Sequence, residues 1–157
     1  MARDLIVFLD FDGVTHPDFH VVDALFGRLP LIEGVLREFD TPRIVISSSW
    51  RTIHSLGVLR EFFSADMASR VIDVTPVMEA QRYNERWLPV LSQHFDRQLE
   101  CEAWLQRNRP RGTPWLALDD WPYWFEPQCP HLLLTDPSQG FQPTDAPRLR
   151  AMIEGRL

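Results

Sequence analysis

Short, almost continuously apolar runs recur along the chain and end at polar or turn-forming residues. Such runs are typical of strands in a parallel sheet, because helices cover both faces of that sheet. The runs predict strands within residues 5–10, 42–48, 69–76, 114–120 and 131–141.

Between these runs, apolar residues return every three or four positions, as they do on one face of a helix. Proline favours the first turn of a helix, and serine or aspartate caps one. The pattern predicts helices from Pro30 through Phe39, from about Trp50 to Phe63, from about Asn84, from about Arg97 to Arg107, and from Thr144 or Asp145 through Ile153.

Strands that alternate with helices indicate an α/β fold with a Rossmann-like, doubly wound, mostly parallel sheet. The length of 157 residues suits a single domain that spans residues 1–157. About thirty residues separate Thr15 from Ile44, and a helix must occupy part of them. Strand and helix signals also fill most of residues 51–96, so we expect little or no cap domain.

Hydrophobic residues make up 45% of the chain and charged residues 24%, which is typical of a folded globular protein. The formal charge of −6 disfavours non-specific binding of nucleic acid. No apolar run approaches the roughly 18 residues of a membrane span, and no signal peptide is evident, so we expect a cytoplasmic protein that binds no membrane. Cys101 and Cys129 form no C-x-x-C pair and are expected to be reduced.

Polar side chains gather where three predicted strands end: Asp10 and Asp12, the serines at 47–49, and Asp119 with Asp120. Ligands bind outside the carboxyl ends of the strands in open parallel sheets, so these residues should converge on one crevice. Four carboxylates in one crevice repel each other unless protons or a cation are present, and hard oxygen ligands favour Mg²⁺. Mg²⁺ beside a nucleophilic carboxylate suits attack on a phosphate.

The stretch from Asp10 to Val14, together with Ser47 and the pair Asp119–Asp120, resembles the first, second and fourth motifs of the haloacid dehalogenase (HAD) superfamily of phosphotransferases. Order and strand context agree over nearly the whole chain. More narrowly, the chain resembles small bacterial domains of this superfamily found with predicted RNA-repair proteins. The segments that carry this closer resemblance are DFDGVTHP, ISSSWR, VTP, EAWL, LDD and TDPSQGF.

The resemblance implies that Asp10 is the nucleophile, which forms an aspartyl phosphate. It implies that Asp12 is the general acid and then the general base, and that its backbone carbonyl binds the metal. Ser47 would hydrogen-bond the transferred phosphoryl group, and Gly13 would let backbone N–H groups approach it.

By the same resemblance, Asp119 and Asp120 would hold Mg²⁺ together with Asp10, either directly or through water. The third motif of the superfamily is usually a lysine, but all 16 basic residues of this chain are arginine. Arg97 is the best positional match, and Arg82 is the second. Arginine stays ionised and can bind carboxylate and phosphate together, although its planar group is bulkier than an ammonium.

Several of these residues also have simpler interpretations. Ser48 either contacts substrate or caps a helix, and Arg51 either binds the substrate phosphate or lies on a solvated helix face. His16 is better explained as a turn residue before Pro17 than as a metal ligand. The aromatic segment at 121–125 is better explained as a buried or half-buried cover of the crevice than as a surface that stacks a base, and Asp136 as the first residue of an Asx-turn.

The sequence therefore predicts a Mg²⁺-dependent phosphohydrolase that acts on a phosphomonoester. An open crevice would admit a phosphate at the end of a large molecule, including a nucleic-acid end. Two alternatives stay open: a receiver-like signalling domain, and a catalytically silent interaction module that has kept the fold without the family lysine.

Overall fold

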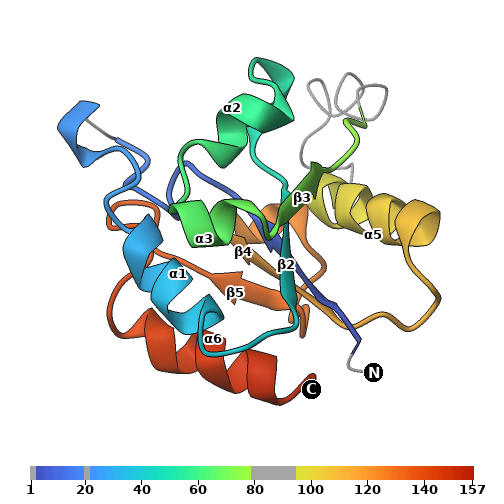
Figure 1. Ribbon diagram of the computed structural model, residues 1–157. Helices are drawn as coiled ribbons and strands as arrows, with labels where there is room; N and C mark the ends of the chain where they lie inside the picture. The colour runs from blue at the N-terminus through green and yellow to red at the C-terminus, as the bar shows by residue number, and fades with distance from the viewer. Residues whose placement is uncertain (1–2, 20–21, 79–94) are drawn as a thin grey trace.

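The computed structural model describes residues 3–19, 22–78 and 95–157 (Figure 1). Its sheet, within these ranges, consists of β1 (Leu5–Leu9), β2 (Pro42–Ile46), β3 (Val71–Val74), β4 (Trp115–Asp119) and β5 (Leu132–Leu134). All neighbouring strands are parallel, in the order β3-β2-β1-β4-β5. This arrangement confirms the predicted Rossmann-like α/β fold.

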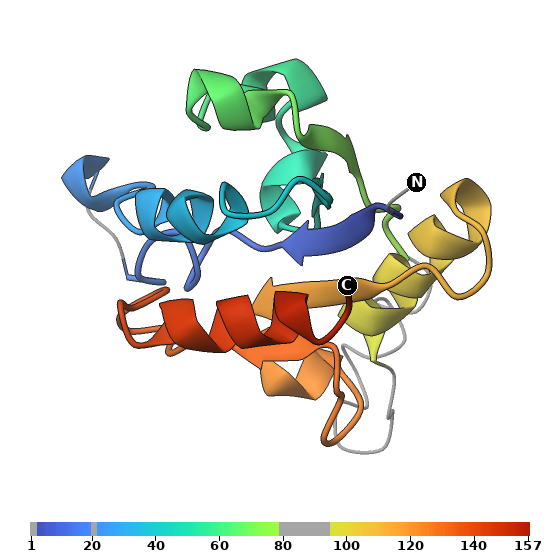
Figure 2. The same cartoon turned by 60° about the horizontal axis from the view of Figure 1, so that its bottom comes forward.

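Helices cover both faces of the sheet, which is why its central strands are apolar throughout. Alternate side chains of β1 pack on opposite faces, with Val7 in the cluster beneath α1 and α6 and Phe8 in the cluster beneath α5. Phe8 meets Trp104 and Trp115 edge to face. The long helices are α1 (Leu29–Leu36), α5 (Asp96–Asn108) and α6 (Asp145–Glu154), and Figures 1 and 2 both show α1 and α6 side by side.

The predicted helix from Trp50 to Phe63 is wrong, because the segment forms two short helices. A 3-10 helix, η2 (Ser49–Thr52), is followed by α2 (Leu56–Arg60). Ser55 lies between them in an extended conformation, and its hydroxyl oxygen accepts a hydrogen bond from the N–H of Val58. A side chain that caps a new helix in this way ends the preceding one.

Other boundaries agree closely with the predictions. Helix α1 begins at Leu29, one residue before Pro30, and α5 begins one residue before Arg97. Helix α6 begins after Thr144, whose side chain makes no capping hydrogen bond. Asp145 instead accepts a hydrogen bond from the N–H of Gln142 at 2.9 Å. The helix predicted from about Asn84 lies outside the described residues.

The described residues between strands build no separate cap domain. Between β1 and α1 they contain the short 3-10 helix η1 (Val22–Ala24), and from residue 53 to 78 they contain α2, α3 (Ala65–Ala68) and β3. The crevice at the carboxyl ends of β1 and β4 therefore has no domain-sized lid within the described part of the chain.

Cys101 and Cys129 are both free thiols, as expected. Of the helices in the described ranges, none has the length and apolar character that crossing a membrane requires.

Candidate active site

The turn after β1 is fixed at several points. Asp10 donates its backbone N–H to Leu118 of β4 at 3.1 Å, and its Oδ1 accepts the N–H of Phe11 at 2.8 Å. The carbonyl of Gly13 accepts the hydroxyl of Thr135, at the end of β5, at 2.7 Å. The turn is therefore attached to two other strand ends, which sets the position of the Asp10 carboxylate.

Gly13 occupies a place that only glycine can take. Its φ of 77° is in the left-handed region, and a Cβ atom there would collide with the carboxylate of Asp120. The backbone of the first motif and the acid of the fourth motif therefore touch directly.

Three carboxylates meet in this crevice. Oxygen atoms of Asp10, Asp119 and Asp120 lie within 4.8 Å of one another, and Asp10 and Asp119 are almost completely buried. Asp119 is held by backbone N–H groups, since its Oδ1 accepts from Asp120 at 2.8 Å and from Trp121 at 3.1 Å. Three close carboxylates from the ends of two strands fit a hard divalent cation such as Mg²⁺.

Burial and mutual repulsion make these acids hard to ionise together. The pKa of Asp10 is raised to about 7, mainly by burial and next by the charge of Asp119. The pKa of Asp120 is also raised to about 7, mainly by burial and next by the charge of Asp10. Burial raises the pKa of Asp119 to about 6. A divalent cation would replace the protons that such a cluster otherwise retains.

Arg97 bridges the acids from the first turn of α5. Its Nη1 lies 3.1 Å from Oδ2 of Asp119 and 3.4 Å from Oδ1 of Asp10, and the side chain is 3% exposed. Burial by itself would lower the pKa of Arg97, but attraction to Asp119, Asp10 and Glu100 raises it, so the guanidinium stays charged. The ring of Trp124 covers the guanidinium at 4.5 Å.

Arg97 thus lies beside the predicted nucleophile, where the resemblance requires the basic residue of the third motif. Arg82, the other candidate, lies outside the described residues.

The Asp12 carboxylate lines the same crevice, as predicted, but it is not one of the three whose oxygen atoms lie within 4.8 Å of one another. Its Oδ1 lies 2.8 Å from Nε2 of His16, and its Oδ2 accepts the indole N–H of Trp50 at 3.1 Å. These two partners hold the Asp12 carboxylate at the crevice wall, beside the cluster rather than within it.

His16 ends the turn at 13–15, as predicted for a turn residue, and it is fully buried. Its Nδ1 accepts the N–H of Phe26 at 3.2 Å, and a backbone N–H can only donate. The ring proton is therefore on Nε2 and is donated to Asp12. The spacing of four residues between Asp12 and His16 was the one feature of the sequence that pointed to this contact, and the prediction did not use it.

The three serines after β2 have different surroundings. Ser47 is buried at the strand end, where its N–H donates to Leu9 of β1 at 3.0 Å. Ser48 caps η2, since its hydroxyl oxygen accepts the N–H of Trp50 at 3.2 Å. Ser49 is the serine that lines the crevice. The position of Ser48 fits the capping interpretation, and Ser49 is an additional candidate for substrate contact.

Arg51 does not lie on a solvated helix face, because it is buried and bound within the protein. Its guanidinium pairs with Glu100 of α5 at 3.0 Å, and Glu100 also lies 3.8 Å from Nε of Arg97. Arg51 also donates to the backbone carbonyls of Ser47, Ser48, Thr75 and Pro76. It joins the ends of β2 and β3 to α5 and is not among the residues that line the crevice.

The crevice has a volume of about 240 Å³, and its wall contains Asp10, Asp12, Asp18, Asp120, Ser49, Arg97, Trp121 and Trp124. The expected aromatic cover is partly present. Trp124 is half-buried and Phe125 is buried, but Tyr123 is 73% exposed and Trp121 is 47% exposed. Asp136 forms the predicted turn, with its Oδ1 accepting the N–H of Ser138 at 2.9 Å.

Comparison with protein families identifies the family of this chain. A family model described as the HAD domain in Swiss Army Knife RNA repair proteins matches residues 6–146. The chain belongs to this family. The match extends from β1 into the first turn of α6 and so includes every strand end of the crevice, which confirms the HAD resemblance. No curated protein and no solved structure matches the chain.

Proposed function

We propose that this HAD domain is a Mg²⁺-dependent phosphohydrolase that acts through an aspartyl phosphate. The observation that carries the proposal is the meeting of Asp10, Asp119 and Asp120 within 4.8 Å, with Arg97 between two of them. A buried acid cluster beside a fixed cation suits the attack of a carboxylate on a phosphate group.

Asp10, Asp119 and Asp120, with the backbone carbonyl of Asp12, would hold the Mg²⁺ ion. When bound, the ion supplies positive charge that offsets the repulsion between the nucleophile and the phosphate. Arg97 keeps Asp10 in position and presents further positive charge to the phosphoryl oxygens, a task that a planar guanidinium can perform in place of the usual lysine.

In the first step an Asp10 oxygen bonds to phosphorus and the bond from phosphorus to the ester oxygen breaks. Asp12 donates a proton to the leaving oxygen. In the second step Asp12, now a carboxylate, takes a proton from water as the water attacks phosphorus. The acyl phosphate bond then breaks, which releases inorganic phosphate and restores the Asp10 carboxylate.

Gly13 would let backbone N–H groups approach the phosphate, and the hydroxyl of Ser47 or Ser49 would hydrogen-bond it. The substrate would be a phosphomonoester, and its phosphate would sit at the end of a larger molecule because the described residues form no cap domain. A nucleic-acid end is our favoured class, and the family description, which names RNA repair proteins, supports it.

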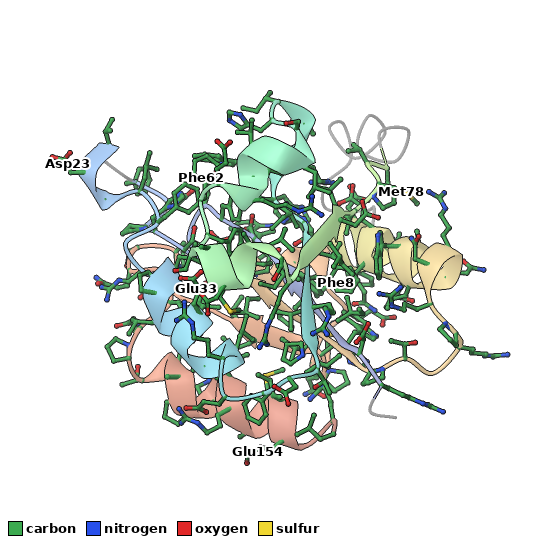
Figure 3. All side chains as sticks on the ribbon, viewed as in Figure 1. Phe8, Asp23, Glu33, Phe62, Met78 and Glu154 are labelled. Atoms are coloured by element: carbon green, nitrogen blue, oxygen red, sulfur yellow. The ribbon has the colours of Figure 1, made fainter. Side chains whose placement is uncertain are left out.

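The test is phosphate release from p-nitrophenyl phosphate with Mg²⁺. We expect turnover by the wild type and none by Asp10→Asn, because the amide is not a nucleophile. Asp23→Asn, the same change on the exposed η1, is the matched control and should keep full activity (Figure 3).

A catalytically silent module is the second candidate, because no lysine is present in the chain. Failure of the wild type to release phosphate from any monoester would favour that candidate. A receiver-like domain has less support, for two reasons. The phosphorylated aspartate of a receiver follows a strand in the middle of its chain, whereas Asp10 follows the first strand, and the chain matches a HAD family.

A further inference from the structure

A second pocket opens beside the acid crevice, with a volume of about 690 Å³. Asp120 and Trp121 line both hollows, so the two are adjacent. A phosphate placed among the acids would therefore have the group it is attached to at the mouth of this second pocket.

Two exposed aromatic rings form one side of the pocket. Trp121 and Tyr123 lie edge to face, with ring centroids 5.4 Å apart and planes at 70°. Their exposed fractions of 47% and 73% are high for such large side chains. Flat aromatic surfaces at a binding site are suited to stacking against a nucleobase.

The position of Trp121 is tied to the chemistry of the site. Its backbone N–H donates to Oδ1 of Asp119 at 3.1 Å, so its backbone is bound directly to the acid cluster. Trp124, at the other end of the same 3-10 helix η3 (Pro122–Trp124), covers Arg97. The segment thus presents one ring to the catalytic arginine and two rings to the pocket.

The charges of the pocket limit what it accepts. Among the described residues that line it, the acidic ones are Asp120, Asp136 and Asp145, and the one arginine, Arg148, is paired with Asp145 at 2.6 Å. An uncharged base fits these surroundings, whereas a second phosphate group would be repelled.

We propose that this pocket binds the base of the single nucleotide whose phosphate enters the acid crevice, stacked on the ring of Trp121 with Tyr123 beside it. This inference rests on the proposed function and narrows its substrate to a nucleotidyl phosphate. Recognition extends over one nucleotide, so a mononucleotide and a phosphorylated oligonucleotide end carry the same recognised group.

The test compares kcat/KM for nucleoside 5′- and 3′-monophosphates with kcat/KM for ribose 5-phosphate, which has no base. Trp121→Ala should lower kcat/KM for the preferred nucleotide about tenfold more than kcat/KM for ribose 5-phosphate. Trp121→Phe keeps a ring and should retain most of the activity on nucleotides. Equal losses on both substrates, or no loss on nucleotides, would overturn the proposal.

A binding measurement removes the dependence on turnover. In the Asp10→Asn protein with Mg²⁺, 2-aminopurine riboside monophosphate should lose fluorescence on binding because its base stacks, and the added change Trp121→Ala should abolish that loss. Absence of quenching in Asp10→Asn would contradict the subsite. Absence of phosphate release from every monoester would instead contradict the proposed function.

Oligonucleotides with a terminal phosphate separate the two sources of the nucleotide. An oligonucleotide that gains no more than about twofold in kcat/KM over the mononucleotide agrees with recognition of one nucleotide. A gain that grows with each added nucleotide would overturn that limit.

Discussion

Asp12 is held at both carboxylate oxygens, by the Nε2–H of His16 and by the indole N–H of Trp50. His16 is itself oriented by Phe26, whose φ of 58° is unusual for a bulky residue and aims its N–H at the imidazole. The position of the proposed general acid is therefore determined by side chains that are not among those lining the crevice.

Trp50→Phe tests this positioning. The ring would still pack against Phe11, Phe26 and Phe62, while the hydrogen bond to Asp12 would be lost. A poor leaving group such as an alkoxide depends most on the proton that Asp12 donates. We therefore expect kcat/KM for an alkyl phosphate to fall at least about tenfold more than kcat/KM for p-nitrophenyl phosphate. Equal losses for both esters would show that Trp50 does not act through Asp12.

Gly13→Ala tests the close approach between the first and fourth motifs. The new methyl group would meet Asp120 and the backbone would be strained at φ 77°, so we expect a loss of about 1–3 kcal/mol in the free energy of unfolding, together with loss of activity. Denaturant unfolding measures the first effect.

Gly34→Ala is the matched control, because no atom lies within 4 Å of a Cβ placed there in α1. It should leave activity unchanged and stabilise the protein by about 0.5–1 kcal/mol. A loss at Gly13 no larger than the effect at Gly34 would contradict the steric explanation.

At the scale of elements, helix α5 joins the acid cluster to the ends of β2 and β3. Glu100 lies fully buried between Arg51, which binds the ends of β2 and β3, and Arg97, which binds the acids at β1 and β4. The placement of Arg97 thus depends on a buried carboxylate one helical turn away.

Glu100→Gln removes the negative charge between two buried guanidinium groups. We expect a loss of about 3–5 kcal/mol in the free energy of unfolding. Glu102→Gln, the same change at an exposed position of α5, should have almost no effect. Comparable denaturation curves for the two variants would contradict the structural role of Glu100.

For the whole molecule, the acid cluster links stability to pH and, on the proposed function, to Mg²⁺. The pKa of Asp10 is raised to about 7 and that of Asp119 to about 6, from an ordinary 3.8. At a pH between the ordinary pKa and the raised pKa values, the folded protein binds more protons than the unfolded chain. The free energy of unfolding therefore falls as the pH rises from about 4 to 7. On the proposed function, the ionised carboxylates would bind Mg²⁺, and this binding would restore stability.

Thermal unfolding measures this dependence. Without metal, these acids should lower Tm as the pH rises from 5 to 7.5, and millimolar Mg²⁺ should raise Tm more at pH 7.5, where protons no longer compete. Asp119→Asn should reduce the metal effect. A Mg²⁺ shift of equal size at both pH values would contradict coupling between the cluster and the ion.

Some elements follow from local pattern alone. The apolar runs predicted the strands because a parallel sheet buries both faces, and Pro30 marked the start of α1 to within one residue. The helix from Trp50 to Phe63 was predicted wrongly, because spacing does not reveal that Ser55 turns its hydroxyl to cap a new helix.

By itself the sequence determined the parallel α/β fold and the strand ends at which Asp10, Asp119 and Asp120 lie. Hydrophobic periodicity and the succession of strands and helices along the chain are both read directly from the sequence. Only the tertiary structure decided that Asp12 turns to His16 and Trp50, that Arg51 is buried against Glu100, and that Trp121 and Tyr123 face a pocket. These outcomes depend on how side chains from distant segments pack and pair, and no spacing along the chain specifies that geometry.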